Sequence, residues 1–227
     1  MIFPFWQITT RGSLLSAKYY VARPAVYAMQ ILLTLGTGIG GAVLADGIIL
    51  HGRSGAAGHL GHISLDMDGG LCICGNRGCL ETRFSARAIE SDYWAHMHRG
   101  AAAKLSFNSA EETPNVESIL AAAVDGKPSA QCVLGRATEY LTAAVVSFVN
   151  IFDPDVVILG GNIAAAGRQL FEPLREQVAA RTRPMLGRDL PIVQQSIIGF
   201  GGVAGAAVSC SCNKACLSWK GGREHEF

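Results

Sequence analysis

Residues 58–81 read GHLGHISLDMDGGLCICGNRGCLE, and this stretch decides how the rest of the sequence is interpreted. Three cysteines (Cys72, Cys74 and Cys79) stand close together, and His62 precedes them. Thiolate and imidazole groups are the usual ligands of tetrahedral structural zinc, and one histidine with three cysteines is a common set. Gly75 and Gly78 allow the backbone to turn sharply around a shared ion. The stretch therefore predicts one structural zinc ion bound by these four side chains.

The alternative is that the three cysteines are unrelated buried residues. Residues 51–80 are rich in glycine and show little hydrophobic periodicity, so a core offers them little support. Long irregular segments are uncommon, and most are functional. A bound ion would substitute for the missing core, because its binding free energy becomes local folding free energy. With four protein ligands no coordination position stays open for water, which favours a structural metal over a catalytic one.

The sequence before this loop predicts a small meander of strands. The apolar run 31–35 ends at a glycine and is typical of a buried strand, and residues 42–45 predict a returning strand. Asp46-Gly47 is a strong hairpin signal before a third strand at 48–50. The glycines at 36, 38, 40 and 41 predict a turn between the first two strands, where backbone N–H groups can approach phosphate oxygens.

The sequence after the loop alternates helices and strands, which predicts an α/β domain. Ser85 is a plausible N-cap for the first of these helices. Helices are predicted at 86–104, 116–124, 129–152 and 164–182, and buried strands at 156–159 and 192–197, before a small-residue helix start at 202–208. Asp153-Pro154 should end the long helix, because proline cannot continue it. Cys132, within that helix, is interpreted as a core residue.

Composition and charge narrow the classes of function. The 227 residues are 49% hydrophobic and 16% charged, as in an ordinary globular protein. The net charge of +1 gives no electrostatic argument for nucleic acid or an anionic membrane. The opening MIFPFWQITT lacks the features of a signal peptide, and seven cysteines are an odd number, so neither export nor a disulfide framework is expected. A cytoplasmic location without a membrane span is the default expectation.

The loop also resembles the signature of the ROK family (repressors, open reading frames and sugar kinases). The family pattern C-x-C-G-x-x-G-C-x-E matches Cys72 to Glu81 completely, with LTLGTGIGG before it and PDVVILGGN after it. The resemblance extends over about residues 28–208. It implies an α/β fold, namely the C-terminal lobe of an actin-like ATPase (ribonuclease H-like, hexokinase-type), with a zinc-bound loop at 58–81.

The resemblance also implies roles for individual side chains of the loop. His62, Cys72, Cys74 and Cys79 would be the zinc ligands. His62 would also contact the sugar, and Glu81 would bind a sugar hydroxyl. His59 stands where many members have glutamate. A histidine at this place resembles the pattern of the subset that includes N-acetylmannosamine kinases, so His59 is a third expected sugar contact. The alternatives are that Glu81 is a capping or solvated carboxylate and that His59 is a partly exposed loop residue without a ligand.

Two glycine-containing segments would bind the nucleotide. By resemblance, Gly36, Thr37 and Gly38 form the second phosphate-contacting loop of a sugar kinase. Gly160, Gly161 and Asn162 would lie against the adenosine, which agrees with the tendency of ligands to bind beyond the carboxyl ends of strands. ATP with Mg²⁺ is the expected co-substrate. The glycines alone are weak evidence, because they lack the Lys-Ser/Thr of a P-loop.

The leading prediction is an ATP-dependent sugar kinase that phosphorylates a hexose or N-acetylhexosamine hydroxyl, often as a homo-oligomer in this family. The first alternative is a sugar-sensing repressor, which alone would bring nucleic acid as a partner, and the second is an inactive remnant. Neither the family's D-x-G-G-T strand nor its Asn-Asp motif, whose Asp is the catalytic base, is found, so no catalytic residue is predicted. The chain is accordingly expected to be an N-terminally truncated member, inactive alone. Residues 1–27 and 209–227 are interpreted as atypical segments, and Cys210, Cys212 and Cys216 as incidental.

Overall fold

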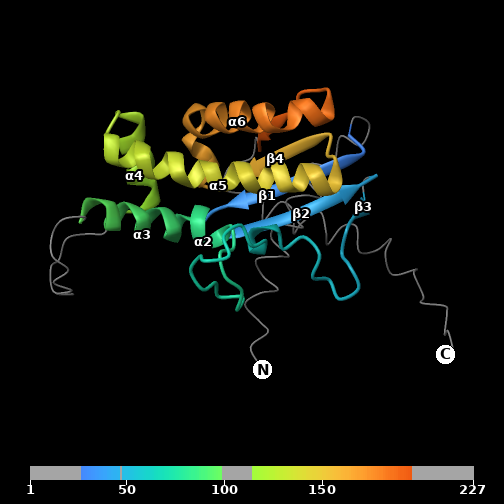
Figure 1. Cartoon of the computed structure of the whole chain (residues 1–227), viewed down its shortest axis with the longest axis horizontal. Coiled ribbons are helices and arrows are strands. Elements are labelled where there is room, and N and C mark those ends of the chain that lie inside the picture. The colour runs from blue at the N-terminus through green and yellow to red at the C-terminus, as the bar shows by residue number, and fades with distance from the viewer. Residues whose placement is uncertain (1–26, 47, 99–113, 196–227) are drawn as a thin grey trace, which may run out of the picture.

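A single five-stranded sheet organises the fold (Figure 1). The computed structural model describes residues 27–46, 48–98 and 114–195. The sheet has the order β3-β2-β1-β4-β5, with β1 antiparallel to β2 and parallel to β4. The strands are β1 Met29–Leu35, β2 Ile39–Ala45, β3 Ile48–Ile49, β4 Val156–Gly160 and β5 Ile192–Gln194. The predictions made for residues 1–26, 99–104 and 196–227 lie outside the described residues.

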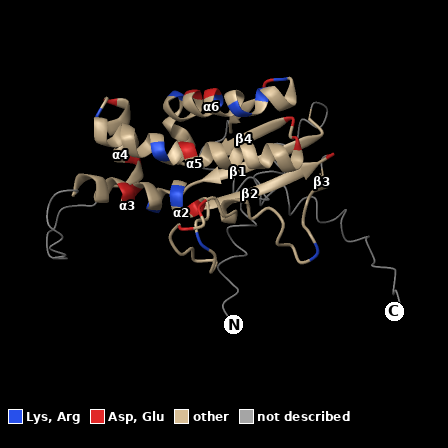
Figure 2. Cartoon of the chain, in the orientation of Figure 1, with Lys and Arg blue, Asp and Glu red and all other residues tan. Residues whose placement is uncertain are grey.

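The central strand β1 is buried on both faces, which agrees with its mostly apolar sequence. Ile31, Leu33 and Leu35 belong to the larger core cluster, whereas Leu32 belongs to a smaller cluster on the opposite face. The predicted hairpin is confirmed, because Ala45 pairs with Ile48. Figure 2 shows charged residues on the helices, and the five described strands contain none.

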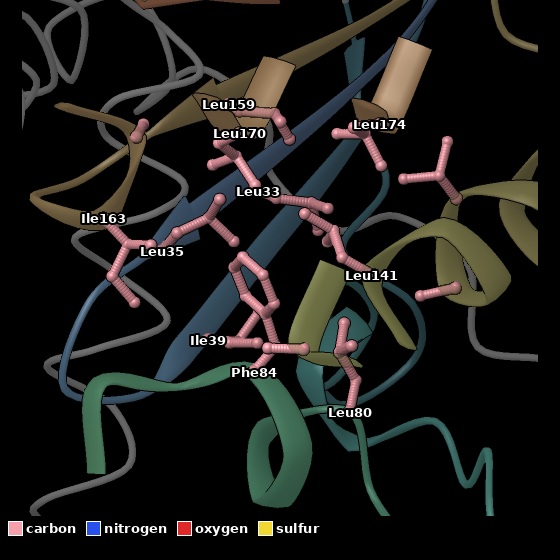
Figure 3. Close-up of a cluster of buried hydrophobic side chains, with 14 of the residues drawn as sticks. Leu33, Leu35, Ile39, Leu80, Phe84, Leu141, Leu159, Ile163, Leu170 and Leu174 are labelled. Atoms are coloured by element: carbon pink, nitrogen blue, oxygen red, sulfur yellow. The ribbon is translucent and has the colours of Figure 1, made fainter. Parts of the chain in front are cut away.

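Helices α5 and α6 lie over one face of the sheet (Figure 1). The described helices are α2 Glu81–Phe84, α3 Ala86–Met97, α4 Val116–Val124, α5 Pro128–Phe152 and α6 Arg168–Leu186, with short 3₁₀ turns η1 Leu60–His62 and η2 Ile163–Ala166. The side chains of β1, β4, α5 and α6 meet those of α2 in one cluster, which Figure 3 shows in close-up. The short helix α2 is therefore part of the core, although it lies at the end of the irregular loop.

Helix α5 is the main core helix. Among the described residues it alone has the length and mean hydropathy of a membrane span, but 56% of its most apolar window is buried inside the fold. Leu141, Val145 and Phe148 are fully buried. The helix ends where predicted, at Asp153, whose φ of 42° is left-handed, just before a proline. The features of α5 are thus those of a helix that packs against a sheet.

Four predictions about local structure need correction. The turn between the first two strands covers only residues 36–38, so Gly40 and Gly41 belong to β2. The helix predicted at 164–182 is split, because Gly167 adopts a non-helical conformation (φ 59°, ψ −133°) between η2 and α6. Helix α3 ends at Met97 instead of continuing. Cys132 is exposed, because it lies on the solvent-facing side of α5.

Candidate metal centre and the adjoining glycine turn

The four predicted metal ligands converge in the structure. The ligand atoms of His62, Cys72, Cys74 and Cys79 all lie within 4.8 Å of one another. Sγ of Cys72 is 3.4 Å from Nδ1 of His62, and Sγ of Cys74 is 3.6 Å from Sγ of Cys79. Residues as far apart in sequence as His62 and Cys79 therefore meet at one point.

These separations fit a tetrahedral zinc ion. With Zn–S bonds of about 2.3 Å and Zn–N bonds of about 2.0 Å, neighbouring ligand atoms should be about 3.5–3.8 Å apart. The two measured contacts, 3.4 Å and 3.6 Å, are close to that range. The donor set of three sulfurs and one nitrogen is also the one that zinc accepts. The residues present thus fit the predicted metal.

Burial and the neighbouring groups shift the pKa values of the four candidate ligands. Burial lowers the pKa of His62, an effect that the Glu81 carboxylate opposes and the nearby His59 reinforces, so the imidazole is neutral near pH 7. Burial raises the pKa of Cys72, and it raises that of Cys79 to about 12 together with the neighbouring thiols. Burial also acts upward on Cys74, but hydrogen bonds from the Asn76 backbone and the other two thiols lower its pKa overall. Metal binding must therefore displace protons from at least two thiols.

Short backbone contacts shape the metal loop, defined here as residues 58–80. Asn76 accepts a hydrogen bond from the Cys72 amide at 2.7 Å, and Gly78 accepts one from the Leu65 amide at 2.8 Å. Gly78 has a φ of +62°, and a Cβ there would lie 1.7 Å from the carbonyl oxygen of Asp66. Only glycine fits this position. The backbone at Gly78 therefore passes close to the backbone at Asp66, immediately before the last ligand, Cys79.

The side chain of Glu81 connects the metal loop with the turn at 36–38. Helix α2 begins at Glu81, two residues after the ligand Cys79. Its Oε2 accepts a hydrogen bond from the Ile39 amide at 2.8 Å. The predicted sugar-binding carboxylate thus also contacts the predicted phosphate turn, and it is close enough to His62 to influence its pKa. The Glu81 side chain is half-buried and bonded to a strand of the sheet.

His59 lies beside the metal centre. It immediately precedes η1, and its ring centroid is 6.1 Å from that of His62 at an interplanar angle of 54°. The side chain is half-buried. His62 thus lies near both His59 and Glu81.

The second predicted nucleotide segment meets the same turn from the other side. Asn162 follows β4, and its Oδ1 would be 3.2 Å from a Cβ added to Gly36. Its Nδ2 donates a hydrogen bond to Oε1 of Glu117 on α4 at 2.8 Å. Gly161 has a φ of +92°, and a Cβ there would be 2.2 Å from the Leu35 carbonyl oxygen. The ends of the neighbouring parallel strands β1 and β4 therefore bring both glycine segments together.

Sequence patterns did not identify three of the contributing residues. Glu117 orients Asn162, and Arg83 forms an ion pair with Asp66 that ties α2 to the metal loop. These contacts join segments far apart in sequence, and no local pattern carries them. Thr37 stands in the turn as predicted, between the two glycines.

Comparison with known proteins agrees with this geometry. The model of the ROK family matches residues 12–211. The glucokinase of Thermotoga maritima is 37% identical over 180 residues, which cover 78% of this chain and 56% of that protein. The N-acetylmannosamine kinase of Vibrio cholerae is 33% identical, covering 66% of this chain and 47% of that protein. The xylose repressor of Caldicellulosiruptor bescii is 32% identical, covering 67% of this chain and 38% of that protein. The chain thus spans about half the length of the curated relatives it matches or less.

Solved structures give the same picture of the fold. The ROK hexokinase from Thermus thermophilus superposes with a TM-score of 0.75 at 27% identity, over 92% of this chain and 65% of that one. A ROK family glucokinase from Streptomyces griseus, in complex with glucose and AMPPNP, gives a TM-score of 0.71 at 25% identity, over 89% and 66%. The predicted actin-like fold is thereby confirmed. The extent of the family match, together with the Cys/His cluster, shows that this chain belongs to the ROK family.

Proposed function

We propose that the chain is part of an ATP-dependent sugar kinase that transfers a phosphoryl group to a hexose or N-acetylhexosamine hydroxyl. One observation carries the proposal: Glu81, two residues after the metal-ligand candidate Cys79, accepts a hydrogen bond from Ile39, the residue that follows the glycine turn. A carboxylate suited to sugar hydroxyls and a turn suited to phosphate oxygens are the two parts that such a transfer must bring together. The kinase relatives support the same assignment.

The sugar would bind against Glu81, His62 and His59. A carboxylate accepts hydrogen bonds from hydroxyl groups, and a neutral imidazole can donate as well as accept. Glu81 uses Oε2 for the Ile39 amide, so Oε1 is the oxygen that would accept from a hydroxyl. Nδ1 of His62 faces Cys72, which directs the opposite ring edge, with Nε2, away from the metal. His59 would add a second imidazole, whose ring N–H can donate a hydrogen bond, and this donor distinguishes the site from one with glutamate there.

The nucleotide would bind across the ends of β1 and β4. The amides and the Thr37 hydroxyl of residues 36–38 would contact phosphate oxygens, because glycine backbones allow close approach. Gly160, Gly161 and Asn162 would lie against the adenosine, and Glu117 fixes the orientation of the Asn162 amide. Mg²⁺ would accompany the ATP phosphates.

The predicted zinc ion would be held by His62, Cys72, Cys74 and Cys79. When bound, it would supply structural cross-linking of the loop, with no open coordination position. The chain's own residues then act around it. His62 is fixed in one ring orientation, and α2 starts at a fixed distance from the cluster, so Glu81 is preorganised toward the sugar.

The test is phosphoryl transfer to a panel of sugars that includes glucose and N-acetylmannosamine. The assay uses this chain and, in parallel, the longest reading frame that contains it. We expect sugar-dependent ADP formation from MgATP by the longer product, and a Glu81→Ala variant should lose most of it. A longer product that has an intact base and turns over none of the sugars would contradict the proposal.

A second candidate is a sugar-sensing repressor, which the 32% identity to the xylose repressor supports. Both candidates share the sugar site and differ in what accompanies it. Sequencing upstream of the coding region for this chain separates them, because a repressor requires a helix-turn-helix segment and a kinase requires the D-x-G-G-T strand. Binding of operator DNA by the longer product, with no ADP formation, would favour the repressor.

A further inference from the structure

The turn at 36–38 is held at both ends by the region around α2. At one end, Oε2 of Glu81 accepts the amide hydrogen of Ile39 at 2.8 Å. At the other end, the amide of Ala86, which starts α3, donates to the carbonyl oxygen of Gly36 at 2.9 Å. The contact with Glu81 joins residues 42 positions apart. The turn therefore depends on the placement of α2 and not only on its own sequence.

The contact at Gly38 is unusually close. A Cβ at this residue would lie 2.6 Å from Oε2 of Glu81 and 3.3 Å from its carboxyl carbon. The carboxylate therefore packs directly against the glycine backbone. A side chain at residue 38 would therefore have to displace the Glu81 carboxylate from its present position.

Helix α2 is in turn fixed to the metal loop. The ligand Cys79 and its neighbour Leu80 are fully buried, as is Phe84 at the end of the helix. Figure 3 shows Leu80 and Phe84 in the same cluster as Leu35 and Ile39, the residues that flank the turn. On the outer side, the ion pair between Arg83 and Asp66 joins α2 to the loop. The metal ligand Cys79 is therefore only two residues from Glu81, and the buried Leu80 between them holds the two in place.

We propose that Glu81 is a positioning residue for the turn at 36–38, so that metal occupancy of the loop sets the order of the turn and its affinity for nucleotide phosphate. The nucleotide part rests on the proposed function, whereas the link between metal and turn does not. Loss of the metal frees Cys79, α2 loses one of its anchors to the loop, and the Glu81 to Ile39 hydrogen bond weakens. A charge-assisted hydrogen bond of this kind is among the stronger ones in a protein.

The first test is amide hydrogen exchange on the full 227-residue chain, with zinc and after chelation. In the wild type, chelation should speed exchange in peptides that contain residues 36–39. In zinc-loaded Glu81→Ala, the Ile39 amide should exchange about tenfold faster or more, while zinc content stays at the wild-type level. Glu81→Gln keeps an oxygen acceptor and should restore most of the protection. Glu139→Ala, an exposed glutamate on α5, is the matched control and should leave exchange unchanged.

A second variant covers the case in which Glu81→Ala folds poorly. Gly38→Ala displaces the carboxylate from the other side and should also expose the Ile39 amide at normal zinc content. The proposal is overturned if turn exchange does not respond to chelation. It is equally overturned if chelation accelerates turn exchange as much in Glu81→Ala as in the wild type, or if Glu81→Ala and Gly38→Ala both retain wild-type protection.

Calorimetric titration with MgATP separates this inference from the proposed function. Wild type should bind more tightly than Glu81→Ala by about tenfold, with Glu81→Gln between them. If zinc-dependent protection of the turn is present but the wild type binds no nucleotide, the proposed function fails while the link between metal and turn stands. If the wild type binds nucleotide and both Glu81 variants bind it equally well, the positioning role of Glu81 is wrong while the proposed function stands.

Discussion

At the scale of single residues, the metal centre combines groups with different surroundings. Cys72 and Cys79 are buried, whereas Cys74 is exposed, and His62 is half-buried. The buried thiols have raised pKa values, so without a metal they hold their protons and pack as small apolar groups. The exposed Cys74, whose pKa is lowered, is the thiol most readily available as a thiolate. Its replacement therefore tests the metal with the least disturbance of the core.

We expect the purified chain to contain about one zinc ion, since four ligands form one tetrahedral site. Cys74→Ser should reduce zinc content strongly, because a serine hydroxyl is a poor zinc ligand. Cys132→Ser is the matched control, because Cys132 is exposed and lies outside the cluster. Metal analysis by mass spectrometry checks both variants. A zinc content far below one in the wild type, or equal in both variants, would contradict the metal assignment.

The crossing at Gly78 gives a second prediction for one residue. Gly78→Ala should lower the free energy of unfolding by about 2 kcal/mol or more, because its φ is +62° and the new Cβ would overlap the Asp66 carbonyl. Gly70→Ala is the control, since no atom lies within 4 Å of a Cβ there and its φ is not left-handed. Urea unfolding of the zinc-loaded protein measures both. Equal stabilities for the two variants would show that the crossing is not rigid.

At the scale of elements, the metal loop is joined to α2 by the ion pair of Arg83 and Asp66. Both side chains are about one quarter exposed, and the Arg83 guanidinium also lies over the Tyr140 ring at 5.1 Å. A double-mutant cycle of Asp66→Asn with Arg83→Met should give a coupling energy of about 1 kcal/mol, because the pair is partly shielded from water. The exposed pair of Arg168 and Glu172 on α6 should give about 0.3 kcal/mol. Urea unfolding supplies both cycles, and coupling energies of equal size would contradict the anchoring role.

Most elements of the fold could be predicted from local sequence. The buried strand at 156–159 was found because an apolar run bounded by glycines is a local signal, and Ser85 was found as the N-cap of α3 because capping is local too. The break at Gly167 was missed, because a glycine inside an apolar helical pattern is usually tolerated. Cys132 was misplaced for a similar reason, since residue type alone does not say which side of α5 it occupies.

The candidate site could be predicted only in part. The four metal ligands follow from residue type and spacing, and the structure brings them together. The contact of Glu81 with Ile39 could not be foreseen, because it depends on how α2 packs against the sheet. The hydrogen bond between Asn162 and Glu117 likewise joins helix α4 to the segment after β4. Contacts of this kind depend on tertiary packing and have no sequence period.

Helix α5 allows a direct test of which element forms the core. Leu141 is fully buried, so Leu141→Ala should reduce the free energy of unfolding by about 3 kcal/mol through lost burial and a new cavity. Ile151 lies on the same helix but is 65% exposed, and Ile151→Ala should cost less than about 1 kcal/mol. Denaturant unfolding distinguishes them. A large effect at Ile151 would mean that this side of the helix is covered in solution.

At the scale of the whole molecule, the metal loop and the sheet share one core. Leu80, next to the last metal ligand, and Phe84, at the end of α2, belong to the same cluster as Leu141 of α5 and Leu33 of β1. A ligand that binds only the folded state stabilises everything that unfolds with it. The metal should therefore stabilise the whole described fold and not the loop alone.

We expect the zinc-loaded chain to unfold in one cooperative thermal transition whose midpoint falls by several degrees on chelation. The shift should be seen equally by far-ultraviolet circular dichroism, which reports mainly on the helices, and by hydrogen exchange in α5. Acidification should have the same effect, because Cys72 and Cys79 have raised pKa values and protons then compete with the metal for their sulfurs. Re-addition of zinc at neutral pH is the control and should restore the midpoint. If chelation loosened residues 58–80 while the helical transition stayed in place, the loop would be an independent unit, and the packing of Leu80 and Phe84 would not couple it to the sheet.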